Sequence, residues 1–338
     1  MKSEDTRLTG LAGVSGKVQR AVGAWREITK HRRVRLSLQA LLFSVCGIYL
    51  FISLQSVSGT LASLHINYVW LAAAWGLTLL AVLLGAMAWW LILLSLGQNV
   101  SWSQSAYTHL FSNLAKYLPG YAWQLMGKAY LTQRLGVSAR LVGLGMTIEF
   151  AQLILVGLGV AVGLVPDGWL MQWLDPGLSS HLHLVKAIAL VGVVMAIFSV
   201  SPFFSVLWRQ SEASWNTAHF LLAALLSILA SWLIFGFSFW LLGSALSPLP
   251  WGDVPLFMFA LTVSVIIGLV VIFAPGGIGV RESLLVFILG PTISPPMAVL
   301  VATLTRVIVA LSELSGAALL AGWLRWHKAT EKDDNSVT

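Results

Sequence analysis

A few charged residues stand inside runs of sequence that are otherwise apolar, and their chemistry needs an explanation. Glu149, Arg306 and Glu313 each lie within a long hydrophobic run. A charge left unpaired near the middle of a membrane helix costs ~2.5 to 3.5 kcal/mol, so each must face protein or water. Arg306 and Glu313 are seven residues apart, about 10 Å along a helix, which is too far for direct pairing. We therefore expect each to have another partner, with Arg306 meeting Glu282 or Glu149.

A proline followed by glycines interrupts one of these apolar runs. Pro275, Gly276 and Gly277 stand at the break, and Arg281 and Glu282 follow at once. Proline lacks a backbone N–H and glycine favours an unwound chain, and backbone groups freed at membrane depth are tolerated only inside protein or beside water. The N-terminus of the next helical segment would attract an anion. The pattern indicates a broken span that lines a cavity, and a plain turn between two helices is the alternative.

A second proline–glycine pair lies in a long connection between apolar runs. Residues 96–140 are too many for a simple loop and unusually apolar for one, and they contain Pro119 and Gly120 with Lys116 just before them. Two half-length apolar segments around such a pair predict a re-entrant hairpin, and two helices lying flat at the interface are the alternative. Paired broken segments in the two halves of a chain are typical of a transporter site.

These features together predict a site for the phosphate of a lipid headgroup. Cationic side chains would hold the phosphate, the two breaks would supply free backbone donors, and acidic residues would balance the charge. The residues expected to bind the headgroup are Lys116, Pro119, Gly120, Pro275, Gly276, Gly277, Arg281 and Arg306, and the balancing residues are Glu149, Glu282 and Glu313. The alternative is that these ion pairs only join helices. No catalytic motif with the required spacing is found, and we expect no catalytic residue, metal site or cofactor.

The composition assigns the chain to the integral membrane proteins. Of its 338 residues 58% are hydrophobic and 10% charged, and the mean hydropathy is +0.85. The apolar runs are long and uninterrupted, so the spans are helices and not barrel strands. The one cysteine, Cys46, lies in the first apolar run, which excludes a disulfide framework or a cysteine-based metal cluster.

We expect an all-α, polytopic fold with about eight spans and both termini in the cytoplasm. The expected spans are residues 36–56, 69–95, 141–164, 184–207, 219–246, 255–274, a short segment at 280–291, and 296–324. Loop charges support this order, because three loops without lysine or arginine alternate with segments that are mostly basic. The alternation holds only if the short segment after the second break crosses the membrane, because the preceding span ends inside and the last span must start outside.

The chain divides by charge into three parts. Residues 1–35 carry nine lysines and arginines and three acids, which accounts for six of the net charge of +7. Such a basic segment beside a first span indicates a cytoplasmic tail that contacts anionic lipid, with either an interfacial amphipathic helix or a solvated chain. Residues 36–326 form the expected transmembrane domain, and 327–338 form a polar cytoplasmic tail. Nucleic-acid binding is not expected.

The two breaks and the last-span arginine resemble a known family. The element from Lys116 to Gly120, the element from Pro275 to Glu282, and Arg306 are similar to those of the flippase-like transmembrane domain that precedes the catalytic domain of lysylphosphatidylglycerol synthases. The resemblance covers about residues 36–326. It implies a lipid translocase in a bacterial or archaeal cytoplasmic membrane, with the two broken elements meeting near the membrane centre.

The resemblance also sets the alternatives for function. No aminoacyl-transferase domain follows the last span in this sequence, so we expect a stand-alone member and do not carry lysyl transfer over. The first expectation is movement of an anionic lipid or a polyprenyl phosphate, with net pumping dependent on an ion gradient. The second is a membrane subunit or partner of a separate lipid-modifying transferase, and the third is a scaffold.

Overall fold

The protein is a bundle of helices, seen here in a computed structural model. The structure describes residues 66–117, 122–171, 181–193, 195, 216–270 and 280–334, and all secondary structure in these ranges is helical. Its long helices are α4 (Tyr68–Ser95), α7 (Ala139–Leu164), α11 (Asn216–Leu246), α12 (Val254–Val270) and α14 (Pro295–Asp334). Within the described chain, five helices are long and apolar enough to cross a membrane. The polytopic helical fold predicted from the sequence is confirmed.

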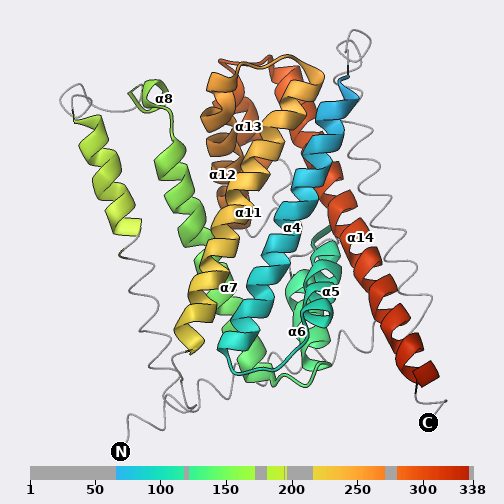
Figure 1. Cartoon of the computed structure of the whole chain (residues 1–338). Coiled ribbons are helices and arrows are strands. Elements are labelled where there is room, and N and C mark those ends of the chain that lie inside the picture. Colours follow the sequence, from blue (N-terminus) through green and yellow to red (C-terminus); the bar gives the residue numbers. More distant parts are fainter. Residues whose placement is uncertain are drawn as a thin grey trace, which may run out of the picture.

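The shorter elements lie between these long helices (Figure 1). They are α5 (Trp102–Asn113), η1 (Leu114–Tyr117), α6 (Ala122–Gln133), α8 (Asp167–Met171), an apolar helix at Leu182–Val193, η2 (Trp251–Asp253) and α13 (Val280–Leu289). Polar residues mark where several helices begin: Asn67, Ser101 and Ser138 each accept a hydrogen bond from a backbone N–H in the first turn of α4, α5 and α7. Gly97 and Gly136 follow α4 and α6 with positive φ angles, which glycine adopts without strain.

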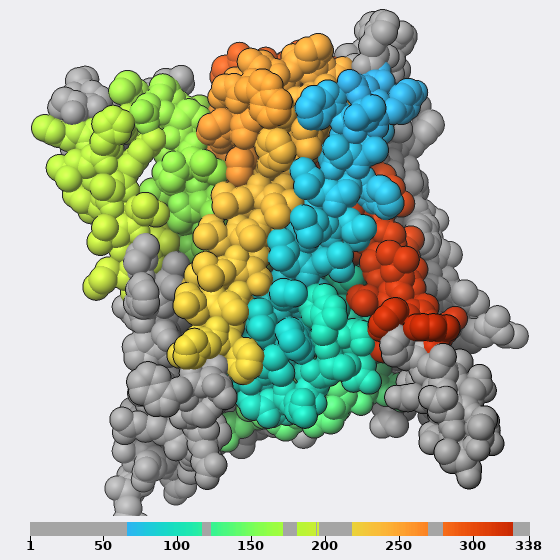
Figure 2. All heavy atoms as spheres, in the orientation of Figure 1, coloured from blue at the N-terminus to red at the C-terminus, as the bar shows by residue number. Residues whose placement is uncertain are grey.

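Helices α4 and α11 lie side by side on the face of the bundle seen in Figure 2 and run antiparallel along their length. Small polar residues join them: the hydroxyls of Thr78 and Ser238 lie 3.1 Å apart, and Ser231 donates to the carbonyl of Ala81. Lipid tails give apolar helices no hydrophobic reason to associate, so close packing and such hydrogen bonds supply the attraction.

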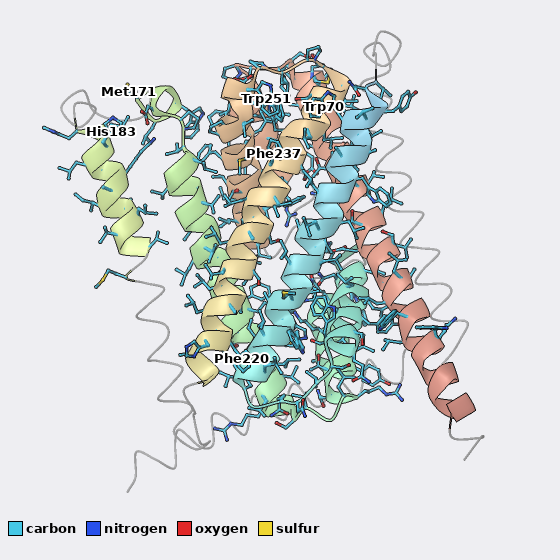
Figure 3. The ribbon with its side chains drawn as sticks, in the orientation of Figure 1. Trp70, Met171, His183, Phe220, Phe237 and Trp251 are labelled. Carbon is cyan, nitrogen blue, oxygen red and sulfur yellow. The ribbon has the colours of Figure 1, made fainter. Side chains whose placement is uncertain are left out.

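The described parts of the three expected outer loops gather at one end of the bundle. Trp70, Met171, His183 and Trp251 lie together at that end, and Phe220 lies at the other (Figure 3). Trp70, Trp240 and Trp251 form a contact cluster there, with the last two ring centroids 4.5 Å apart. Aromatic clusters of this kind are usual where a helix leaves the hydrocarbon. We call this end of the bundle the α8 end and the opposite one the α5 end.

Two helical hairpins enter the bundle from opposite ends (Figure 1). The α5 hairpin consists of α5, η1 and α6; it begins and finishes at the α5 end and runs beside the lower halves of α4 and α14, as the re-entrant prediction requires. The α12 hairpin consists of α12 and α13 and enters from the α8 end, where α14 starts. With ten residues, α13 is about 15 Å long, half the hydrocarbon thickness. The prediction that this short segment crosses the membrane was therefore wrong: α13 is too short to cross and returns the chain to the α8 end.

Several predicted features lie outside the described residues. These are the basic tail and first span (1–56), most of the distal half of the 184–207 span, and both breaks with Pro119, Gly120, Pro275, Gly276 and Gly277. The other predicted spans agree with α4, α7, α11 and α12 at their starts, while α14 continues beyond the predicted end at 324 to Asp334.

Candidate functional site

The tip of the α5 hairpin is attached to α14 by an ion pair. Lys116 lies in η1, directly before the first break, and its Nζ is 2.6 Å from Oε1 of Glu313. The two helices approach closely here because α14 carries a glycine: a Cβ on Gly316 would lie 2.9 Å from the side chain of Leu110, which is fully buried. The sequence predicted roles for Lys116 and Glu313 without predicting that they pair.

The base of α13, directly after the second break, is attached to the same helix. Nε of Arg306 lies 2.5 Å from Oε1 of Glu282, which confirms the predicted pairing of Arg306 with Glu282. The neighbouring Arg281 lies across α12, where a Cβ added to Gly268 would come within 2.6 Å of its Nε. Gly268 therefore gives Arg281 the space for its path along α12.

Both pairs have their cation on the more open side and their carboxylate behind it. The side chain of Lys116 is 25% exposed and that of Glu313 is 3%, while Arg306 is 21% exposed and Glu282 is 10%. An anion approaching either pair meets the cation first. Each carboxylate lies deeper than its cation and holds it in place.

Helix α14 joins the two hairpins through one face. At 1.5 Å per residue, Arg306 and Glu313 lie about 10 Å apart on the same side of α14, and they fall on either side of the middle of its spanning segment, Pro295–Trp326. Two of the cations expected at the headgroup site thus belong to two ion pairs on α14, one at each hairpin. Lys116 and Arg306 each have a carboxylate partner.

Glu149, the other acid considered as a partner of Arg306, pairs elsewhere. It lies on α7 and is bound by Lys128 of α6, and its Oε1 is 3.3 Å from Nδ1 of His109 on α5. The pairing with Arg306 is taken by Glu282, since Glu282 begins α13 beside α14 while α7 packs on the other side of the α5 hairpin. Glu149 therefore balances the charge of a lysine, but it does so in a cluster that is separate from the two ion pairs on α14.

The family follows from a comparison with known proteins. Residues 37–312 match the family described as the lysylphosphatidylglycerol synthase TM region, and this match covers most of the chain. The chain belongs to this family. No curated protein matches it. The matched segment of this lysylphosphatidylglycerol synthase TM region contains Lys116, Glu149, Glu282 and Arg306, and Glu313 follows directly after its end.

His109 and Lys128 are the residues that the sequence reasoning missed as parts of a site. Neither residue was among those expected to bind the headgroup or to balance its charge. A signal was present: the two residues stand at similar distances on either side of Pro119–Gly120, so a hairpin that turns there brings them opposite each other. They do meet, with Nζ of Lys128 3.1 Å from Nδ1 of His109.

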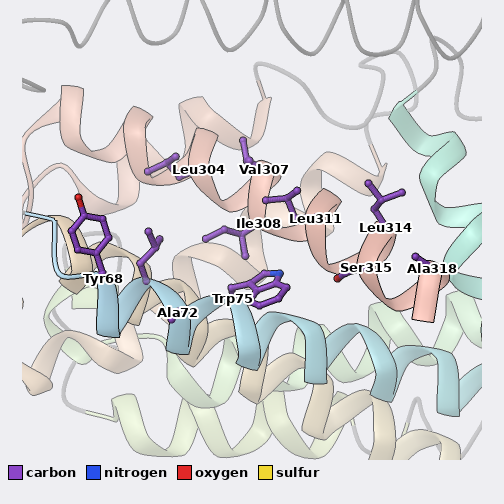
Figure 4. Close-up of a pocket in the computed structure, with 11 residues that line it drawn as sticks. Tyr68, Ala72, Trp75, Leu304, Val307, Ile308, Leu311, Leu314, Ser315 and Ala318 are labelled. Atoms are coloured by element: carbon purple, nitrogen blue, oxygen red, sulfur yellow. The ribbon is translucent and has the colours of Figure 1, made fainter. Parts of the chain in front are cut away.

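A large groove of this membrane region lies on another face of α14. It has a volume of ≈ 560 Å³ and is walled by the first half of α4, including Trp75, and by α14 residues such as Ile308 and Leu311 (Figure 4). At 3.6 residues per turn these α14 residues point roughly away from Arg306 and Glu313. The groove suits hydrocarbon, and the charged face that joins the hairpins is the candidate headgroup site.

Proposed function

We propose that this lysylphosphatidylglycerol synthase TM region moves lipids with an anionic headgroup, or lipid-linked phosphates, between the two leaflets. The observation that carries the proposal is that two partly exposed cations, Arg306 on α14 and Lys116 bound to Glu313 of α14, lie where the two hairpins each contact this helix. A headgroup that leaves one leaflet would meet one cation and then the other before it reaches the opposite leaflet.

At each of the two ion pairs, the proposed chemistry is an exchange of partners. Arg306 presents a planar fork of N–H donors that matches a phosphate in two contacts, and Lys116 presents a compact charge on a flexible stem. A phosphate can share or displace the carboxylate on each cation, so binding costs less than burying a bare charge. Glu282 and Glu313 form their ion pairs with Arg306 and Lys116 again when the headgroup leaves.

The test is lipid movement in liposomes that contain the purified full chain. Fluorescent lipids of equal tails, with anionic, zwitterionic and cationic headgroups, would be followed by their accessibility to a membrane-impermeant quencher. The native chain should move the anionic lipid faster than empty vesicles do, and Lys116→Gln should reduce that rate at least about tenfold, which corresponds to ~1.4 kcal/mol.

A matched control uses a lysine that also forms an ion pair but lies elsewhere. Lys186 binds Asp167 at the α8 end, so Lys186→Gln removes one cation and one ion pair without touching the hairpins. Its lipid movement should equal that of the native chain. Equal movement of all headgroups, or equal loss in Lys186→Gln and Lys116→Gln, would refute the proposed site.

A second candidate function follows from the family itself. The matched family is described by the membrane region of a lipid-modifying synthase, so this chain could serve as the membrane partner of a separate transferase. The two functions differ in the effect of Glu282→Gln: a translocase loses lipid movement, while a transferase partner loses formation of the modified lipid.

A further inference from the structure

A second group of charged side chains is buried in the half of the bundle nearer the α5 end. Lys128 and His109 are 4% and 8% exposed, and the Glu149 side chain is 14% exposed. The Nζ of Lys128 also lies 3.9 Å from the ring centre of Trp89, which is fully buried on α4. Three titratable groups from three helices thus meet where a charge is costly, and the proposed headgroup site uses none of them.

The hydrogen bonds of His109 conflict with one another. Its Nδ1 is 3.1 Å from Nζ of Lys128, a donor, and 3.3 Å from Oε1 of Glu149, an acceptor. A bare Nδ1 can accept from Lys128 but repels the carboxylate, whereas a protonated Nδ1 donates to Glu149 and leaves Lys128 to its carboxylate contact and the Trp89 ring. The two arrangements exclude each other, so the position of one proton decides which neighbour His109 binds.

The choice of partner has a mechanical consequence. Without the proton on Nδ1, His109 joins α5 to α6 within the hairpin; with it, His109 joins α5 to α7 outside the hairpin. The same helix continues through η1 to Lys116, two turns further on, which is bound to Glu313 of α14. A shift of α5 between α6 and α7 is therefore transmitted directly to the ion pair of Lys116 with Glu313 in the headgroup site.

The charged surroundings of the three side chains are few and known. Helix α4, which packs against them through Gly85 and Trp89, contributes no charged group. Among the described residues, the charges facing His109 are Lys128 from α6, Glu149 from α7 and, further off, Lys116 from η1 with its partner on α14.

We propose that His109, Lys128 and Glu149 form a proton-binding site that couples lipid movement to the transmembrane pH gradient. Water delivers the proton to Nδ1 of His109, and the imidazolium donates it in a hydrogen bond to Glu149; release to water on the opposite side restores the bond from Lys128. The coupling rests on the proposed lipid movement, whereas the proton site itself does not.

The proton site can be tested without lipid movement. The full chain in lipid nanodiscs, with ¹⁵N-labelled histidine, would be titrated from pH 4 to 9 by solid-state NMR, and the His109 signals assigned by their loss in His109→Gln. His109 should change state within this range. Glu149→Gln should move the midpoint to lower pH, because it removes the anion that favours imidazolium, and Lys128→Met should move it to higher pH.

His219 supplies the control, since it is exposed at the start of α11. Its midpoint should stay the same in both variants. A His109 that keeps one protonation state over the whole range, or that shifts equally in Glu149→Gln and Lys128→Met, would overturn the proton site.

The coupling is tested in liposomes with an imposed pH gradient. With one proton exchanged per lipid, a gradient of one pH unit can drive an accumulation of up to about tenfold in one leaflet. The native chain should show this accumulation, and His109→Gln should move lipid without it. Lipid movement in the native chain that does not respond to the gradient would overturn the coupling but leave the proposed lipid movement intact. Absence of any lipid movement would refute the proposed function. In that case the NMR titration would still decide whether the proton site exists.

Discussion

The two hairpins have related shapes but are held in different ways. The α12 hairpin packs through the largest apolar cluster of the described structure, which includes Phe257, Leu261 and Ile288, and adds the ion pair of Glu282 with Arg306. The α5 hairpin packs through smaller apolar clusters, which include Leu110 and Ala129, and adds the polar contacts of His109 and Lys128 and the ion pair of its tip with α14. Dispersion contacts over a close-packed surface have one arrangement, while hydrogen bonds and ion pairs can exchange partners. We infer that the α12 hairpin is the fixed half of the site and the α5 hairpin the half that moves.

The largest effect on stability is expected when one charge is removed from the fixed half. Arg306→Met leaves Glu282 buried without its partner and should lower the free energy of unfolding by about 3 kcal/mol, at the lower end of the usual cost because Arg306 is partly exposed. The double variant Arg306→Met with Glu282→Met should recover most of the loss. Thermal unfolding in detergent measures both, and a double variant as unstable as the single one would show that the pair is not what positions α13.

The packing difference predicts unequal tolerance to added volume. A Cβ on Gly236 of α11 would meet Met258 of α12 at 2.9 Å and its backbone Cα at 3.2 Å, whereas a Cβ on Gly316 would meet the ends of two side chains, Leu110 at 2.9 Å and Leu79 at 3.5 Å. Gly236→Val should therefore destabilise by about 1 to 3 kcal/mol, and Gly316→Val by less, since Leu110 can change rotamer. Gly163→Val, with open space around it, is the control. A greater loss at Gly316 than at Gly236 would reverse the assignment of fixed and moving halves.

The position of Arg281 offers a subtler change in the fixed half. Gly268→Ala adds a methyl group where Arg281 crosses α12 and should displace that side chain without altering any charge. We expect a few-fold decrease in the rate of anionic lipid movement in liposomes with little change for zwitterionic lipid. A uniform decrease for all headgroups would indicate that Gly268 matters for packing alone.

The smallest expected effect is the pH response of the ion pair between Asp167 and Lys186, which lies outside both hairpins. Hydrogen bonding from Lys186 holds the pKa of Asp167 below its usual value. The contact is therefore present above the ordinary aspartate range and lost as pH falls through the lowered pKa. Hydrogen exchange of the 182–193 helix should accelerate beyond the intrinsic rate change as pH falls below the ordinary aspartate range, and Asp167→Asn should remove this extra pH dependence. An unchanged profile in Asp167→Asn would exclude the ion pair as its cause.

The sequence was sufficient for the long helices and for one ion pair. Uninterrupted apolar runs predict spans because each must cover the hydrocarbon thickness, and Arg306 needed a nearby acid, of which Glu282 was one of two candidates. The partners of Lys116, Lys128 and Glu149 could not be obtained in this way. They depend on how far each hairpin enters and how it is rotated against α7 and α14, which is decided by tertiary packing around residues such as Gly316.

Lys128 shows most clearly why a pattern can mislead. A lysine in a long connection supports a cytoplasmic loop by the positive-inside rule, and the same lysine is almost completely buried once the connection folds back into the bundle. Charge counting assigns a side of the membrane to the whole loop, so it cannot distinguish a solvated lysine from one that holds two helices together.

The most direct measurement compares the rates of anionic and zwitterionic lipid movement for the native chain and for the double variant Arg306→Gln with Glu282→Gln. This variant removes both charges of the Arg306–Glu282 ion pair and keeps a neutral hydrogen-bonding pair in their place. Its unfolding temperature should therefore remain close to native. We predict that anionic lipid movement falls at least about tenfold, so that the preference for the anionic headgroup disappears. Native rates and native preference in a folded double variant would contradict a headgroup path through Arg306.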